Sequence, residues 1–185
     1  MTLEVEQKFH VDDRQALERK LKEIGATKTG SMEQHDIYLV HPSRDLPSTD
    51  EAFRIRYDSK ETLICYKGPK QPGKVKIREE IEVPVPDGHI GDLRKMLSHL
   101  GFGERATVNK HRETWQVLIS GTSIGPITVA LDSVENVGEF AEVELVVEEH
   151  QADEASQQIS TLASRLGLTN REQRSYIALL LANIG

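Results

Sequence analysis

Charged and apolar residues alternate with a period of two in several stretches of the chain, as in Glu4-Val5-Glu6 and Arg54-Ile55-Arg56. In a β-strand, residues i and i+2 share one face, so each stretch directs its charges to one side of a sheet and its apolar residues to the other. The charged positions of this pattern are Glu4, Glu6, Lys8, Arg54, Arg56, Lys67, Lys76, Arg78, Glu80, Glu82, Lys110, Arg112, Asp132, Glu142 and Glu144. A sheet face with so many charges of both signs is either exposed to water or encloses a polar cavity.

The same pattern predicts the elements of the fold. Strands are expected over about residues 3–9, 36–40, 52–58, 62–67, 74–83, 107–119, 126–134 and 138–148. Apolar residues at helical spacing predict helices over about 13–25, over a segment that stops at Gly101, and over about 152–166 and 171–183. Pro84 is expected to end the strand before it. Because helices do not alternate strictly with strands, we expect an antiparallel sheet with helices outside, an α+β fold, in one domain over residues 1–185.

Composition and charge narrow the classes of function. The chain has 185 residues and a formal charge of −7, which argues against a nucleic-acid polymer or an anionic membrane as partner. No stretch approaches the roughly 20 apolar residues that a membrane helix needs. The one cysteine, Cys65, cannot form an internal disulfide, and Met1-Thr2-Leu3-Glu4 lacks the basic and apolar regions of a secretory signal. We therefore expect a cytoplasmic protein.

Two pairs of glutamates are candidates for binding a cation. Glu4 and Glu6, like Glu142 and Glu144, place two carboxylates on one strand face, roughly 6.5–7 Å apart. Oxygen ligands at this spacing suit a shared Mg²⁺ or Mn²⁺, which also retains waters and phosphate oxygens. The alternative is that each pair is only the solvated face of a strand.

Two pairs of basic residues suit a phosphate ligand. Arg54 and Arg56, and Lys110 and Arg112, stand at i and i+2. Guanidinium groups match phosphate oxygens in bidentate geometry, and lysine adds a point charge. A solvated face or cross-strand ion pairs would explain each pair equally well. Acidic and basic residues interleaved in one interior favour a ligand that brings both anionic oxygens and a metal, as a polyphosphate–metal complex does.

Several motifs resemble those of one known family. Residues Glu4-Val5-Glu6-Gln7-Lys8-Phe9 contain the E-x-E-x-K motif that opens the CYTH superfamily, the triphosphate tunnel metalloenzymes. The later blocks follow the family order: Asp36-Ile37-Tyr38, Phe53-Arg54-Ile55-Arg56, Tyr66-Lys67-Gly68-Pro69, Arg78-Glu79-Glu80-Ile81-Glu82, Lys110-His111-Arg112, Leu131-Asp132 and Glu139-Phe140-Ala141-Glu142-Val143-Glu144. The tail Gln173-Arg174-Ser175-Tyr176 resembles that of the class IV, or CyaB-type, adenylyl cyclases. The resemblance covers about residues 3–181.

This resemblance implies an antiparallel eight-stranded β-barrel, open at its ends, in a single CYTH-like domain. By position, the metal ligands would be Glu4, Glu6, Glu80, Asp132, Glu142 and Glu144. The triphosphate would bind to Lys8, Arg54, Arg56, Lys67, Arg78, Lys110, Arg112 and Arg174. The family also associates proton handling with Lys8 and Tyr38, and we group Arg174 with them as a catalytic candidate.

The resemblance implies a metal-dependent enzyme, but the sequence leaves its reaction open. A class IV adenylyl cyclase converts ATP to cyclic AMP and pyrophosphate, whereas other family members hydrolyse inorganic or thiamine triphosphate. There are two further alternatives. One is a non-catalytic protein that binds a nucleotide or polyphosphate, and the other is a structural β-domain whose charged face is only exposed to solvent. A monomer and a homodimer are both compatible with the sequence.

Overall fold

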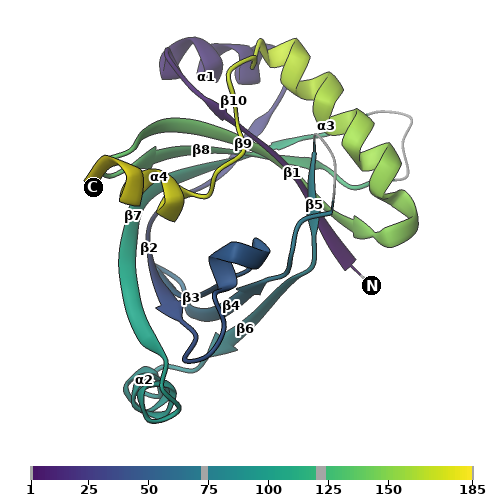
Figure 1. The fold of residues 1–185 in the computed structure, drawn as a ribbon. Coiled ribbons are helices and arrows are strands. Elements are labelled where there is room, and N and C mark those ends of the chain that lie inside the picture. The colour runs from purple at the N-terminus through teal and green to yellow at the C-terminus, as the bar shows by residue number, and fades with distance from the viewer. Residues whose placement is uncertain (1, 72–74, 120–123, 185) are drawn as a thin grey trace.

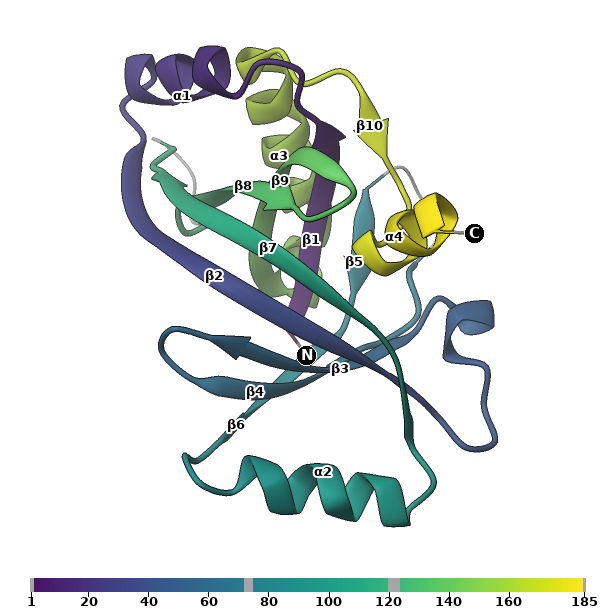
Figure 2. The same cartoon turned by 90° about the vertical axis from the view of Figure 1, so that its left-hand side faces the viewer.

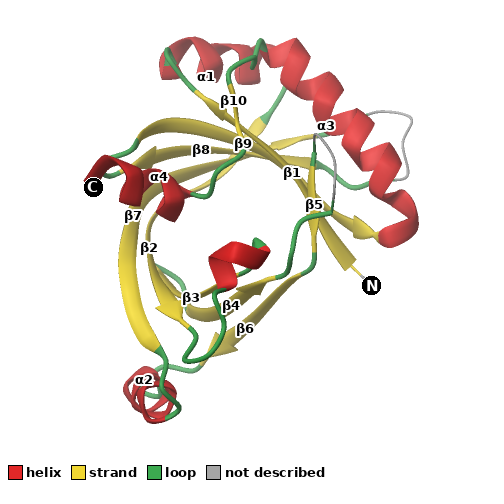
Figure 3. Cartoon of the chain, in the orientation of Figure 1, coloured by secondary structure: helices red, strands yellow, loops and turns green. Residues whose placement is uncertain are grey.

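The computed structural model describes residues 2–71, 75–119 and 124–184, whose strands form one antiparallel sheet that curves into a nearly closed barrel (Figure 1). The elements in chain order are β1 (Thr2–His10), α1 (Arg14–Glu23), β2 (Thr27–Val40), η1 (Leu46–Thr49), β3 (Ala52–Asp58), β4 (Thr62–Lys67), β5 (Lys76–Arg78), β6 (Glu80–Val85), α2 (Ile90–His99), β7 (Gly103–Val117), β8 (Ile127–Val134), β9 (Gly138–Glu148), η2 (Glu149–Gln151), α3 (Ala152–Leu166), β10 (Arg171–Glu172) and α4 (Tyr176–Ile184). The predicted α+β architecture is confirmed (Figure 3).

The described residues form ten strands rather than the eight expected. Their order is β10-β1-β9-β8-β7-β2-β3-β4-β6, and β5 pairs with β1 beside this path. The expected strand over 74–83 is thus divided at Glu79, with its first part on β1 and its second part on β4. Residues 76–85 thus pair with β1 near one end of the sheet and with β4 near the other end. This shared segment brings the two ends of the sheet together.

Other boundaries also differ from those expected, and β7 begins at Gly103 rather than near residue 107. Strand β2 begins at Thr27, nine residues before the expected 36–40, because most of its length pairs with β7. Pro84 does not end β6, since β6 is the last strand of the path and Pro84 needs no partner for the N–H it lacks. The last helix begins at Tyr176, because Arg171 and Glu172 pair with β1 instead.

The apolar faces of β1, β8 and β9 form the main core beneath α1 and α3. Val5, Val129 and Val143 are fully buried there, in one cluster with Leu21 of α1 and Ile159 of α3. Neighbouring residues of a strand point to opposite faces. The charged residues next to these valines, such as Glu4, Glu6 and Glu142, therefore point toward the inside of the barrel. We call this inner space the lumen.

A second apolar layer covers another part of the barrel. Ile55 of β3 and Leu39 of β2 pack with Leu97 of α2, which lies on the opposite side of the barrel from α1 and α3 (Figure 2). Arg54 and Arg56, the neighbours of Ile55, are buried on the lumen side. No helix in the described residues is long and apolar enough to cross a membrane.

Candidate active site

Four glutamates of the neighbouring strands β1 and β9 face the lumen. The register places Glu6 opposite Glu144 and Lys8 opposite Glu142, and residues so opposed have Cβ atoms about 4.5–5.5 Å apart. Glu4, Glu6 and Glu142 are buried. The two glutamate pairs that the sequence singles out therefore meet in one place. We refer to Glu4, Glu6, Glu142 and Glu144 as the glutamate quartet.

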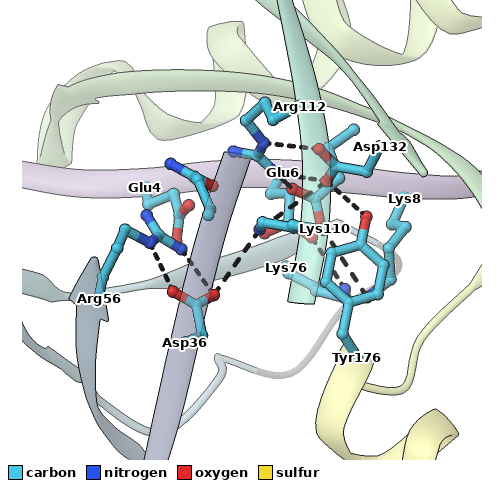
Figure 4. A network of polar contacts seen from close by, with 12 residues as sticks. Glu4, Glu6, Lys8, Asp36, Arg56, Lys76, Lys110, Arg112, Asp132 and Tyr176 are labelled. Carbon is cyan, nitrogen blue, oxygen red and sulfur yellow. Dashed lines mark hydrogen bonds and ion pairs between the residues drawn. The ribbon is translucent and has the colours of Figure 1, made fainter. Parts of the chain in front are cut away.

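Asp36 of β2 anchors the basic residues of β3. Its two oxygens accept hydrogen bonds of 2.7 and 3.1 Å from Arg56 (Figure 4), and Arg54 and Lys110 lie 3.7 and 3.8 Å from it. Burial favours the neutral acid, but Arg54, Lys110 and Arg56 outweigh it and hold the pKa of Asp36 well below its usual range. Asp36 therefore keeps three lumen cations close together.

Asp132 of β8 has a similar role on the other side of β7 from Asp36. Arg112 donates to its two oxygens at 2.7 and 2.6 Å and also contacts Glu142. Burial raises the pKa of Glu142, but Arg112 and Lys8 outweigh it, and the pKa lies well below the ordinary value. Glu142 is thus an ion-pair partner before any ligand arrives.

Two lysines are neutralised by carboxylates of β1 and β6. Lys67 lies 2.7 Å from Glu4 and 3.0 Å from Glu80, and Lys76 lies 2.9 Å from Glu6. Burial lowers the pKa of Lys67, but Glu4 and Glu80 raise it far above its ordinary value. Lys67 is therefore firmly charged.

Lys8 and Lys110 differ from these two lysines, because within the described residues no carboxylate oxygen comes within hydrogen-bond distance of either. Lys8 lies 3.9 Å from Glu142, and Lys110 lies 3.8 Å from Asp36 and 3.9 Å from Asp132. Burial lowers the pKa of each lysine to about 8, even though these carboxylates oppose it. Both ammonium groups retain donors for an anionic ligand.

Glu144 is the member of the quartet for which the described part of the chain provides no hydrogen bond or ion pair. Burial raises the pKa of its carboxyl to about 8, with Glu4, Glu142 and Glu6 adding to the effect against the influence of Arg112. A carboxylate held near three others without a cation of its own is the kind of group that a divalent ion stabilises.

The donor set of the quartet therefore suits the Mg²⁺ or Mn²⁺ that the family resemblance implies. Over the described ranges, no three His, Cys, Asp or Glu side chains are arranged as a ready metal site. The reason is that Glu4 and Glu6 are turned toward Lys67 and Lys76. A metal would have to compete for them, so metal binding stays a prediction.

The remaining predicted residues lie nearer the mouth of the barrel. Tyr38 is buried and accepts a hydrogen bond of 3.4 Å from Arg54, and Arg78 donates to the backbone oxygen of Asp50 at 3.4 Å. The Arg174 side chain is 58% exposed and pairs with Glu172 at 2.7 Å. The structure thus brings Tyr38 and Arg78 to the lumen but leaves Arg174 outside it.

Three lumen residues were not among the predicted site residues. Lys76 belongs to the period-two pattern but was not carried into the predicted site, and Asp36 stands two positions before Tyr38, so extending the pattern would have found it. Tyr176 begins an apolar helix and reaches the lumen, and no periodicity marks it.

A cavity of about 410 Å³ adjoins the lumen at the mouth beside η1 and α4. Tyr38 and Arg78 line both this cavity and the lumen. The other lining residues include Leu39, Val40, Leu46, Pro47, Ala52, Phe53, Ile177, Ala178, Leu181, Arg44, Arg105 and Arg174. The charged residues of the lining are Arg44, Asp45, Asp50, Glu51, Lys70, Arg78, Arg105 and Arg174. A space with both apolar and charged walls suits an organic group attached to a phosphate chain.

Comparison with known proteins identifies the family of this chain. A family model described as CYTH domain matches residues 2–176. The chain is 32% identical, over 96% of its length and 98% of the relative, to a Methanocaldococcus jannaschii protein named "Putative adenylate cyclase MJ0240". It is 29% identical, over 92% of its length and 80% of the relative, to the thiamine-triphosphatase of Macaca fascicularis. The solved structure of PH1819 from Pyrococcus horikoshii OT3 superimposes with a TM-score of 0.83 at 35% identity, covering 97% of this chain and 98% of that one. The chain belongs to the CYTH domain family.

Proposed function

We propose that the protein is a metal-dependent enzyme that acts on an organic triphosphate, as a class IV adenylyl cyclase acts on ATP to form cyclic AMP and pyrophosphate. The observation that carries the proposal is the lumen itself. It holds two lysines without a hydrogen-bonded carboxylate, a half-buried glutamate to which no described residue gives a hydrogen bond or ion pair, and arginines ordered by Asp36 and Asp132. A triphosphate with a divalent metal would satisfy all of these groups.

Each set of residues would have its own task. Lys8 and Lys110 would bind phosphate oxygens first, and Arg54, Arg56 and Arg112 would hold the chain in line for displacement. The quartet, with Asp132 and Glu80 nearby, would hold Mg²⁺ or Mn²⁺, which when bound neutralises charge on the phosphate oxygens and on the leaving group. Glu4 and Glu6 would exchange their contacts with Lys67 and Lys76 for the metal.

In the cyclase reaction, the ribose 3′-oxygen would bond to the α-phosphorus while the bond from the α-phosphorus to pyrophosphate breaks. The hydroxyl proton needs an acceptor. Lys8 is suited to this role in the fraction of molecules in which it is neutral, because its pKa is lowered to about 8. In those molecules Lys110 and the arginines would hold the phosphates. Tyr38, at the border of the lumen and the mouth cavity, would contact the nucleoside side of the substrate.

A triphosphatase is the second candidate, and the similarity to thiamine-triphosphatase favours it. In that reaction water attacks the terminal phosphorus, and the same cations and metal would serve. The mouth cavity favours an organic triphosphate such as ATP or thiamine triphosphate over inorganic triphosphate, since the inorganic ion has nothing to place there.

Incubation of the purified protein with each of the three triphosphates, in Mg²⁺ or Mn²⁺ and in EDTA, separates these reactions. Cyclic AMP with pyrophosphate from ATP supports the cyclase, and release of orthophosphate supports the triphosphatase. Activity that is unchanged in EDTA would contradict the metal requirement. Tight binding without any product would favour a non-catalytic binder.

Filling the mouth cavity tests the placement of the organic group. We expect Ala178→Trp to raise KM for ATP or thiamine triphosphate by about tenfold while inorganic triphosphate binds as before, because the indole occupies the cavity and not the lumen. Ala182→Trp is the matched control, since Ala182 is exposed on the same helix and does not line the cavity. Equal losses for organic and inorganic ligands would contradict this placement.

A further inference from the structure

The ring of Tyr176 lies beneath both of the lysines that lack a hydrogen-bonded carboxylate. The Nζ atom of Lys8 is 4.0 Å from the ring centroid, and that of Lys110 is 5.1 Å from it. Both distances are within the roughly 6 Å at which an ammonium group is attracted to an aromatic face. Figure 4 shows Tyr176 reaching from α4 toward these two side chains. One ring therefore serves two cations from different strands.

Several contacts hold this ring in place. Its hydroxyl donates a hydrogen bond of 2.8 Å to Asp132, and Phe140 packs against it with ring centroids 5.1 Å apart. Tyr176 is 5% exposed. Burial, with Glu142 and Asp132, raises the pKa of Tyr176 well above its ordinary value, so the hydroxyl stays a donor.

An aromatic face acts on a lysine differently from a carboxylate. Glu6, 2.9 Å from Lys76, neutralises that ammonium group and accepts one of its hydrogen bonds. A ring attracts the ammonium through its quadrupole and brings no net charge. Lys8 and Lys110 are therefore held in position while their positive charge remains available to phosphate oxygens.

We propose that Tyr176 is a positioning residue that holds the ammonium groups of Lys8 and Lys110 toward the triphosphate through the face of its ring. This inference rests on the proposed function, because it takes a triphosphate as the ligand of the two lysines. Tyr176 lies at the first position of α4, whose later residues Ile177, Ala178 and Leu181 line the mouth cavity. The same helix would thus contact both ends of an organic triphosphate.

The test changes the charge distribution of the ring while it keeps the shape. Affinity for inorganic triphosphate in EDTA is measured by calorimetry for the wild type, for Tyr176→Phe, and for proteins with singly to triply fluorinated phenylalanine at this position. Fluorine withdraws electron density from the ring face, so we expect affinity within about twofold of wild type for Tyr176→Phe and a stepwise fall to about tenfold weaker binding with three fluorines.

The controls distinguish the possible failures. The same fluorinated residue at Phe102, which packs in the outer apolar layer under α2, should leave affinity unchanged. Equal affinity along the Tyr176 series would overturn the role of the ring and leave the proposed function standing. A wild type that binds triphosphate neither in EDTA nor with Mg²⁺ would overturn both.

Discussion

A Glu144→Gln substitution should lower metal-dependent turnover by at least about 100-fold, as loss of a metal-positioning group commonly does. It should also stabilise the fold at pH 7 by about 1–3 kcal/mol. The folded state raises the pKa of this carboxyl from 4.5 to about 8, and glutamine supplies a neutral group of the same shape at no ionisation cost. The two effects are measured as kcat/KM with Mg²⁺ or Mn²⁺ and as free energy of unfolding in urea without metal.

The dependence on pH has a definite sign. Between pH 4.5 and about 8, the folded protein retains a proton on Glu144 that the unfolded chain has lost. This carboxyl therefore makes wild-type stability fall as pH rises through that range, and Glu144→Gln should lack this component of the slope. A variant that is less stable than wild type at pH 7 would show that Glu144 has a cationic partner after all.

Glu142→Gln is the matched control on the same strand. It should also reduce turnover, but it should lower stability, because Arg112 and Lys8 would lose a buried partner. The opposite signs of the two stability changes separate a metal ligand without a basic partner from one that already belongs to an ion pair.

An Asp36→Asn substitution should have the largest effect on stability, a loss of about 3–5 kcal/mol, which is typical when one partner of a buried ion pair is removed. Arg54, Arg56 and Lys110 would then face one another without the negative charge that holds them. Urea unfolding at pH 7 measures the loss. The exposed Asp12, changed to Asn as a control, should alter stability by less than about 0.5 kcal/mol.

The same substitution should change the response to acid and to ligand. The pKa of Asp36 is depressed in the fold, so its stabilising contribution is present above the ordinary pKa of 3.8 and is lost as pH falls below it. Asp36→Asn should therefore lose less stability than wild type between about pH 4 and 2. Inorganic triphosphate should raise the Tm of the variant more than that of the wild type, because the ligand restores the missing negative charge. An equal rise in both proteins would argue that the ligand lies away from these three cations.

The positions of most strands along the chain could be predicted from the local pattern of residues. The strand over 62–67 was predicted with the bounds that the structure has, because a short apolar run there ends at the turn residues Gly68 and Pro69. The elements that were misjudged depend on distant partners. The first part of β2 pairs with β7, the segment after Lys76 divides between two sheet ends, and Arg171 and Glu172 extend along β1. None of these pairings leaves a periodic signal.

The sequence by itself determined the facing of most strand residues of the lumen, because the direction of a strand side chain follows from its position and from its apolar neighbours. It also carried the motifs of the CYTH domain family. Only the tertiary structure decided how the lumen charges combine. Register and curvature pair Asp36 and Asp132 with arginines, leave Glu144 without a cation within the described residues, and place Arg174 outside. They also bring Tyr176 beneath Lys8 and Lys110. These outcomes depend on distances between strands far apart in the chain, and such distances are set when the barrel closes.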